Sequence, residues 1–528
     1  MKIAINIILS SLKSRAMLAA YIALSISAGF LVLLSNDRLR RLLDDGLLFQ
    51  ESGVFLPAFF LVALLFLLVL LSGVLSTYLM EKIKWDCEAK LKEHYINKLL
   101  KSDYSYFVNK ETPGIWSLLN TSTQYTTNIV DISVSIISRI ISFIFFCIII
   151  FSINFYAGIL SVAATPLYLV ATAYVGRSFM RLQQQAMEGH REMAVVAQEA
   201  LSNVSIVKTK DAYGFFVARI MKVQYVIAGL MRKFNVLQQY LVGVSAFIGV
   251  LTPVVILFGA IQLSDATVST GDIVVLFINI PLFLERFRSI HAAFVLYKSF
   301  KPGLKHLDEL NAVPGEPIAE IRIDGFESLE TTDVSVSFGD KTVKIPNIGI
   351  KKDEKVMFSG ESGIGKSTLF NILTGLILDY KGIVKVNGID IRLICLQNLR
   401  KVIGIAFQST GVLTVSLREN TSLGLQGQDA RVDELLKLSG LEQQLKDKAD
   451  DILNDKVLSG GEKSRLGLAQ LLMTDPDVLL IDETFSNVDE DMEKIIMERL
   501  LEKYSNKTII YIGHRTTSRG FFDRVVEF

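Results

Sequence analysis

The sequence predicts two different domains in one chain: an all-α membrane domain of six transmembrane helices, followed by an α/β domain of the P-loop kind. Three observations support this division. Long uncharged runs fill about the first 300 of the 528 residues, whereas the remainder has ordinary mixed charge. A loop of the pattern G-x-x-x-x-G-K-[ST] begins at Gly360. Further on, an apolar run ends in the acidic pair Asp482-Glu483.

The amino-acid composition limits the classes of function that fit this chain. Half of the residues are hydrophobic, which is high for a soluble protein. The formal net charge is +1, so nothing argues for a nucleic-acid partner. The three cysteines are scattered without metal-ligand spacing, and we expect no disulfide framework.

Five apolar runs predict six membrane helices. The first is uncharged for 20 residues, enough at about 1.5 Å per residue to cross ~30 Å of hydrocarbon. We interpret it as a retained anchor rather than a secretory signal, because it is long, lacks a clear Ala-x-Ala site and is followed by further spans. A turn at 154–158 divides the longest run into two spans. The predicted spans are 16–35, 54–80, 132–152, 156–176, 236–262 and 271–297.

Charge in the connections predicts the orientation. Segments 81–128 and 177–233 are rich in Lys and Arg, and the turns at 152–158 and 262–270 have none, although three arginines in the first outer loop weaken the rule locally. We therefore expect a cytoplasmic N-terminus. Folded as helical hairpins, the two long segments would reach about 36 Å per arm, far enough to dock on the second domain. The predicted domains are 1–305 in the membrane, a linker at 306–325, and a cytoplasmic domain at 326–528.

The glycine loop predicts phosphate binding. A strand at 354–359 leads into it and a helix follows, so backbone N–H groups and the helix N-terminus can face an anion. Lys366 would supply positive charge to the phosphate oxygens, and the Ser367 hydroxyl would bind Mg²⁺. The predicted ATP-binding residues of this loop are Gly360, Glu361, Ser362, Gly363, Ile364, Gly365, Lys366, Ser367 and Thr368.

The acidic pair adds a second part of the site. An apolar strand that ends in two carboxylates is costly unless they meet a cation or take part in catalysis. Between this strand and the glycine loop lies Leu458-Ser-Gly-Gly-Glu462, two glycines that open a helix with free N–H groups. In this order the three motifs resemble the nucleotide-binding domain of the ABC ATPase family, a RecA-like ABC ATPase domain with a helical subdomain. Nearly the whole chain resembles an exporter-type half-transporter of that family.

The resemblance implies a role for each matching residue. Glu483 would be the general base, His514 the switch histidine and Gln408 the Q-loop glutamine, with Lys366 completing the catalytic set. Ser367, Gln408 and Asp482 would hold Mg²⁺. Phe338 would stack on adenine, although tyrosine is usual there and a core aromatic is the alternative. The signature residues Ser459, Gly460, Gly461 and Glu462 would act on the ATP of a second copy, and Asp489 belongs to the D-loop.

Two departures from the family pattern stand out. Glu462 replaces the more common glutamine, and Asn-Val precedes Asp489 in place of Ala-Leu. Because a signature motif is useless within a single ATPase domain, the resemblance implies a dimer. We expect a homodimer, and a heterodimer with a similar chain stays open.

The implied function is ATP-driven export of a peptide or other amphipathic compound by alternating access, in a bacterial inner membrane. The alternatives are a flippase for lipid or lipid-linked cargo, a multidrug exporter, and, as a lesser one, a membrane regulator that uses ATP only as a switch. Intramembrane charge on the sixth span suggests cavity residues, although water at the cytoplasmic end of that helix is an equal reading. The candidate cavity residues are Glu285, Arg286, Arg288 and His291.

Overall fold

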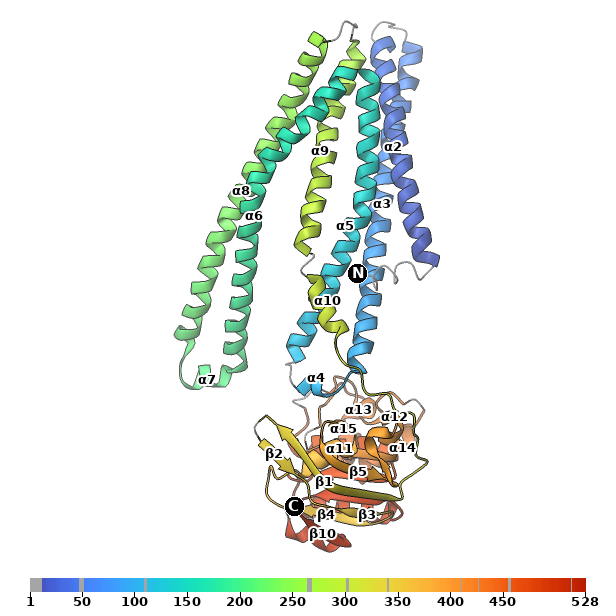
Figure 1. The fold of residues 1–528 in the computed structure, drawn as a ribbon, viewed down its shortest axis with the longest axis vertical. Coiled ribbons are helices and arrows are strands. Elements are labelled where there is room, and N and C mark those ends of the chain that lie inside the picture. The colour runs from blue at the N-terminus through green and yellow to red at the C-terminus, as the bar shows by residue number, and fades with distance from the viewer. Residues whose placement is uncertain are drawn as a thin grey trace. The chain divides into compact units, whose positions relative to one another are not determined.

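The computed structural model describes residues 12–46, 52–108, 112–263, 268–300, 303–339, 341–408, 410–425, 427–453, 457–513 and 515–528. The chain divides into two compact units, Met1–Asn97 with Pro113–Ala312, and Lys98–Thr112 with Val313–Phe528. The first is helical, and the second combines helices with two sheets (Figure 1), so the predicted fold class is confirmed. The predicted domain limits stay a prediction; residues 98–112, which they place within 1–305, group by their contacts with the second unit.

Long helices make up the first unit. Their bounds are α2 Leu12–Gly46, α3 Ser52–Leu100, α5 Thr112–Ile153, α6 Phe155–Ser202, α7 Val204–Thr209, α8 Tyr213–Leu263, α9 Thr270–Phe300 and α10 Gly303–Asn311. The turn between α5 and α6 is set by Asn154, whose side chain accepts a hydrogen bond from the Ala157 N–H at 2.9 Å. Such a cap ends one helix and starts the next. Helices α6 and α8 run side by side (Figure 1).

Apolar side chains cover the outside of the first unit. Among the described residues, four helices are long and apolar enough to cross a membrane: Arg15–Asp45, Phe55–Leu100, Leu118–Ile153 and Tyr213–Tyr240. Two shorter apolar helices are Phe155–Pro166 and Gly249–Leu263. On α3 alone, Leu56, Phe60 and Leu70 are each more than half exposed. A helix that is apolar on all sides requires lipid or another protein around it.

The interior of the first unit is apolar at its centre and polar where α2 meets the start of α9. Buried residues from α5, α6, α8 and α9 form one cluster, and the rings of Phe143 and Phe283 stack beside it with centroids 4.9 Å apart. The buried Asn279 donates a hydrogen bond to Asn36 at 2.7 Å. Nearby, Arg40 on α2 pairs with Asp272 on α9 at 2.6 Å. Buried amides paired with each other avoid the cost of unsatisfied polar groups.

Two sheets organise the second unit. The antiparallel sheet contains β1 Ser328–Phe338, β2 Lys341–Lys344, β3 Gly349–Lys351, β5 Lys381–Val386 and β6 Ile389–Asp390. The parallel sheet has the order β10-β4-β9-β8-β7, with β4 Lys355–Ser359, β7 Ile403–Ala406, β8 Val478–Asp482, β9 Thr508–Ile512 and β10 Arg524–Glu527. Strands β8 and β9 are buried along their whole length, as their apolar runs require.

The helices of this unit fall into two groups. Helices α11 Lys366–Leu373 and α12 Leu396–Val402 contribute to the core that joins the two sheets, and α17 Glu490–Lys503 contributes to a second core. A helical part contains α13 Leu417–Ser422, α14 Asp429–Leu438 and α15 Glu442–Lys448, which pack with α16 Gly460–Met473 in the second core. The turn that follows α3, described over residues 101–108, includes α4 Ser105–Val108. It is held by a bridge between Ser102 and Gly315 and by a hydrogen bond from Asp103 N–H to the Pro314 carbonyl at 3.0 Å.

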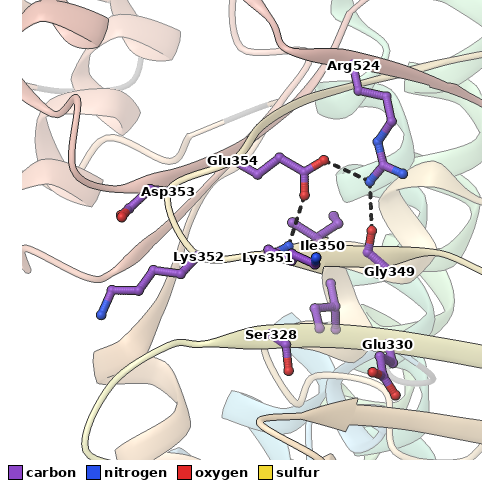
Figure 2. A pocket seen from close by; sticks show the side chains of 10 residues that line it. Ser328, Glu330, Gly349, Ile350, Lys351, Lys352, Asp353, Glu354 and Arg524 are labelled. Atoms are coloured by element: carbon purple, nitrogen blue, oxygen red, sulfur yellow. Dashed lines mark hydrogen bonds and ion pairs between the residues drawn. The ribbon is translucent and has the colours of Figure 1, made fainter.

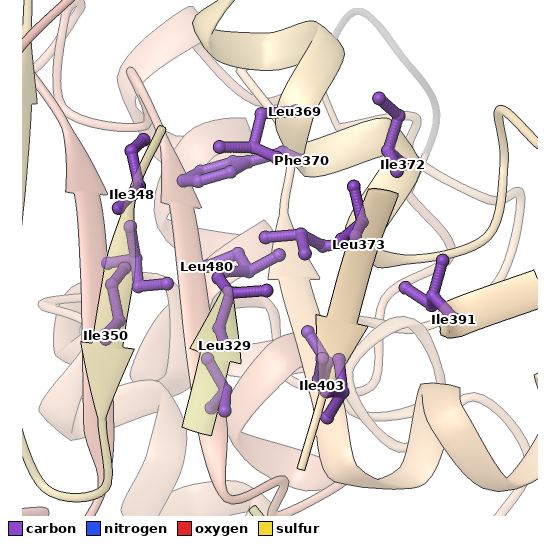
Figure 3. Packing of buried hydrophobic residues seen from close by; sticks show 14 of the residues in the cluster. Leu329, Ile348, Ile350, Leu369, Phe370, Ile372, Leu373, Ile391, Ile403 and Leu480 are labelled. Carbon is purple, nitrogen blue, oxygen red and sulfur yellow. The ribbon is translucent and has the colours of Figure 1, made fainter. Parts of the chain in front are cut away.

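A continuous apolar core fixes the helix that follows the glycine loop. Figure 3 shows Leu329 and Ile350 of the antiparallel sheet facing the α11 residues Phe370 and Leu373, with Leu480 of the parallel sheet among them. Phe370 is fully buried, and its ring lies 6.0 Å from that of Phe358 on β4. Helix α11 is therefore positioned by packing against both sheets.

This packing predicts a stability effect that is separate from ATP contacts. We expect Phe370→Ala to cost about 3–5 kcal/mol through lost burial and a cavity, lowering the temperature of half-inactivation by on the order of 10 °C. Heat inactivation of ATP turnover in lipid discs measures it. Leu393→Ala is the control, since Leu393 is 55% exposed and its loss should change little. Equal effects of the two substitutions would contradict this account.

Candidate nucleotide-binding site

The glycine loop connects the end of β4 to α11 in a conformation that requires glycine. Gly360, Gly363 and Gly365 have φ values of +147°, +81° and +123°. A Cβ at Gly365 would lie 2.5 Å from a methyl group of Val343. No residue with a side chain adopts such a loop without strain. The loop therefore leaves its backbone N–H groups open toward a phosphate.

Lys366 is folded back into this loop. Its Nζ donates to the carbonyl oxygens of Gly360 and Glu361 at 2.7 and 2.9 Å. The residue is 4% exposed, and burial lowers the pKa of Lys366, while the nearby carboxylates of Glu483 and Asp482 act in the opposite direction. The ammonium group is thus held inside the glycine loop, where the predicted contact with β- and γ-phosphates stays a prediction.

The end of β8 brings the acidic pair to the same place. The Ser367 hydroxyl donates to Asp482 at 3.0 Å. Burial raises the pKa of Asp482, and this hydrogen bond partly opposes the rise. A serine hydroxyl and a buried carboxylate are hard oxygen donors of the kind that Mg²⁺ prefers. The residues present therefore fit the predicted magnesium site.

Gln408 and Glu483 are in direct contact. Two residues after β7, the Gln408 amide donates to the Glu483 carboxylate at 2.8 Å. Glu483 has a φ of +44°, which is unusual for a residue with a long side chain. Its N–H donates to the Ile512 carbonyl at 3.1 Å. The structure thus brings together Lys366, Ser367, Gln408, Asp482 and Glu483, which were predicted from separate parts of the sequence.

Two further predicted residues are Phe338 on β1 and His514 after β9. Phe338 ends β1 and is 50% exposed, so its ring is accessible rather than part of the core. This exposure favours stacking of Phe338 on adenine over its alternative role as a core aromatic. His514 lies outside the described residues. It follows β9, whose Ile512 is in register with Asp482.

The signature segment is built as a capped helix start. Ser459 is the N-cap of α16, and its N–H donates to Glu462 at 2.7 Å while its hydroxyl accepts from the Glu462 N–H at 3.3 Å. Gln444 donates a further hydrogen bond to Glu462. Burial raises the pKa of Glu462, but the bonds from Ser459 and Gln444 outweigh burial and lower it. Glu462, which stands where glutamine is usual, thus forms a capping box with Ser459.

The D-loop packs on this helix start, a contact that the motif reading missed. A Cβ at Gly461 would lie 2.6 Å from the Asn487 carbonyl oxygen, whereas one at Gly460 would lie 3.6 Å from the nearest atom of Asn487. Asp489 caps α17 by accepting from the Met492 N–H at 3.0 Å. The small residue at 461 is therefore needed for close approach of the D-loop backbone.

The candidate cavity residues lie on α9 in the first unit. Glu285 and Arg288 form an ion pair at 2.6 Å, with both side chains more than 40% exposed. Arg286 is exposed and His291 is half-buried. On the neighbouring α5, Arg139 donates to the Ser289 carbonyl at 3.3 Å. The ion pair neutralises one charge of each sign, so Arg286 is the exposed cation of this stretch.

A separate open hollow of about 560 Å³ lies where β1, β3 and β4 begin (Figure 2). Arg524 reaches across it, donating to the Gly349 carbonyl at 2.7 Å and pairing with Glu354 at 3.0 Å. Glu354 also accepts from the Lys351 N–H at 2.9 Å. This hollow is at the opposite end of β4 from the glycine loop, and none of the predicted site residues line it.

The two signature glycines allow a matched prediction. Alanine favours a helix over glycine at both positions by about 1 kcal/mol, so Gly460→Ala should leave the melting temperature unchanged or higher. Gly461→Ala places its methyl group against the Asn487 carbonyl oxygen, and we expect it to lower the melting temperature despite the same propensity gain. Thermal unfolding of the two variants side by side measures the difference. Equal melting temperatures would refute the close contact.

Comparison with known proteins agrees with these features. Residues 18–287 match the family model of the ABC transporter transmembrane region, and residues 343–486 match a second family model, described as ABC transporter. A solved bacterial Atm1-family ABC exporter with ATP bound superposes with a TM-score of 0.81 and 20% identity, covering 97% of this chain and 93% of that one. This match supports the fold.

Three curated relatives are similar over most of the chain. An export ATP-binding/permease protein of Rickettsia bellii is 24% identical over 95% of this chain and 90% of its own length. An ATP-dependent lipid A-core flippase of Polaromonas is 25% identical over 92% of this chain and 85% of its own length. A lactococcin-A transport/processing ATP-binding protein of Lactococcus lactis is 26% identical over 82% of this chain, which spans 62% of that protein. Because the membrane-region model alone matches more than half of the chain, this protein belongs to the ABC transporter family, as an integral membrane half-transporter of the exporter type with one ATP-binding domain coupled to transport.

Proposed function

We propose that the chain works as a homodimer that exports a peptide or another amphipathic compound by alternating access. ATP would be held between the glycine loop of one copy and the signature residues Ser459, Gly460 and Gly461 of the other. Membership in a half-transporter family implies a dimer. The observation that carries the proposal is that Lys366, Asp482, Glu483 and Gln408 converge at one edge of the sheet.

Hydrolysis follows from the roles of these side chains. Glu483 would accept the proton of a water molecule as its oxygen bonds to the γ-phosphorus, and the bond to the β–γ bridging oxygen would break to release ADP and phosphate. Gln408, already bonded to Glu483, would orient that water. Lys366 would neutralise charge on the phosphate oxygens. Bound Mg²⁺, held by Ser367, Asp482 and Gln408, would supply further positive charge to the β- and γ-phosphates.

Movement of the substrate would follow ATP-driven closure. Closure of the two ATPase domains would draw the cytoplasmic hairpins together and turn the cavity outward, and hydrolysis would reset it. Positive charge in segments 81–128 and 177–233 supports a cytoplasmic N-terminus and ATPase domain. The bacterial relatives support a bacterial inner membrane as the location.

A peptide or amphipathic cargo is the leading substrate class. The relative from Lactococcus, named for transport of lactococcin-A, supports it. On α9, Glu285, Arg286, Arg288 and His291 would give the cavity polar contacts beside apolar ones. Lipid-linked cargo is the second candidate, because a lipid A-core flippase matches over a larger share of the chain. A multidrug exporter and a non-transporting regulator are the remaining alternatives.

ATP turnover by the purified chain in lipid discs tests the proposal. We expect the wild type to hydrolyse ATP and Glu483→Gln to lose at least 100-fold of that rate while still binding ATP, because the general base is removed. Stimulation by one of three panels, small peptides, lipids or drugs, names the substrate class.

Two outcomes would contradict parts of this proposal, the first the homodimer and the second the role of Glu483. ATP binding without turnover in the wild type would indicate a missing partner chain or a regulatory role. Turnover that Glu483→Gln retains would show that another group activates the water.

A further inference from the structure

A buried carboxylate outside the predicted catalytic set lies in the first turn of α17. Glu493 is 3% exposed and accepts three side-chain hydrogen bonds. Tyr511 donates at 2.9 Å, Ser518 at 2.7 Å and Arg515 at 2.6 Å. A carboxylate at this depth is stable only when its oxygens are satisfied in this way. The end of β9 and the residues that follow it, 511–518, are therefore joined to α17 at one side chain.

Arg515 makes this cluster more than a buried ion pair. One guanidinium nitrogen pairs with Glu493, and the other donates to the carbonyl oxygen of Val488 in the D-loop at 2.8 Å. A planar guanidinium can hold two acceptors at once in fixed geometry, which a lysine ammonium on a flexible stem cannot reproduce. Arg515 thus fixes the D-loop backbone to the segment that follows β9.

The contacts continue on the other side of the D-loop. Asn487, next to Val488, lies against Gly461 at the start of the signature helix. Toward the acidic pair, Arg515 follows strand β9 in the chain. Ile512 of β9 is in register with Asp482 of that pair. Contacts therefore join the signature helix to the D-loop and the D-loop to Arg515, which follows β9 in the chain.

We infer that Arg515 is a positioning residue that makes the two ATP sites of the dimer move together. The inference rests on the proposed sandwich arrangement, in which a chain's signature serves its partner's ATP and its acidic pair serves its own. A D-loop that is fixed to both the signature helix and the segment after β9 cannot change position at one ATP site without also moving the residues that serve the other ATP site. Glu493 holds the guanidinium in the orientation that allows this.

The rival explanation is structural support of α17 alone, and one matched pair of variants separates the two. Arg515→Lys keeps a positive charge near Glu493 but loses the simultaneous bond to Val488. Tyr511→Phe keeps its ring and removes only a hydrogen bond to the same carboxylate. Both variants weaken the hydrogen-bonded cluster around Glu493, but only Arg515→Lys releases the D-loop.

Two readouts in lipid discs test the inference. For Arg515→Lys we expect kcat to fall about tenfold or more, as for the loss of one charge-assisted hydrogen bond, with an unchanged KM for ATP because the glycine loop is intact. The second readout is the ATP retained per chain after rapid desalting in the Glu483→Gln background, which needs no turnover. Arg515→Lys should release this ATP. Tyr511→Phe should keep both properties while lowering the melting temperature.

Each other outcome is decisive. Equal behaviour of the two variants in both readouts would reduce Arg515 to structural support. A lower kcat with fully retained ATP would confine Arg515 to its own site. Both overturn the inference. A wild type without turnover would instead refute the proposed exporter, and the retained-ATP comparison would still decide the role of Arg515.

Discussion

The parallel sheet of the second unit is the constraint on which the ATP site depends. All five of its strands point the same way, so their carboxyl ends meet at a single edge. Phe358 on β4 is in register with Ile512 on β9, and Ile512 with Asp482 on β8. The glycine loop, the acidic pair and the segment after β9 must therefore begin side by side. Gln408 joins them because β7 pairs with β8 at the same level.

Much of this arrangement could be predicted because each part has a local signature. A glycine loop needs specific backbone angles, and only glycine supplies them at low cost, so the pattern is visible in the sequence. A strand buried on both faces appears as an unbroken apolar run, as in β8 and β9. The Asn154 turn likewise combines a helix cap with a break in a very long apolar run.

The features that sequence reasoning missed are contacts between distant segments. The approach of Asn487 to Gly461 and the bridge from Arg515 to Val488 follow no period along the chain. Glu493 did leave a signal: it shares one face of α17 with the buried Ile496, Met497 and Leu500, at helical spacing. An acidic residue on an otherwise apolar face requires a partner, which is the kind of inconsistency that marks a functional or structural network.

The association of residues 98–112 with the second unit shows how such contacts change domain limits. The uncharged run of α3 ends at Met80, and the charged segment 81–128 that follows is predicted as a cytoplasmic hairpin of the membrane domain. The turn that follows α3 is instead held by backbone bonds from Lys101 and Asp103 to the segment 314–316. Helix α3 has 49 residues, about 74 Å of continuous helix, and ends within the second unit.

The geometry at Glu483 indicates that the protein itself positions the candidate base. Its left-handed backbone, at a φ of +44°, costs on the order of 1–3 kcal/mol and persists only when neighbouring residues hold it. Here the next two residues are buried: the Thr484 hydroxyl donates to the Ala406 carbonyl at 3.3 Å, and Phe485 is 1% exposed. The Glu483 N–H is fixed by Ile512. Because the core of the domain holds this strained residue, little reorganisation of the base remains for the moment of reaction, which is how preorganised groups lower a barrier.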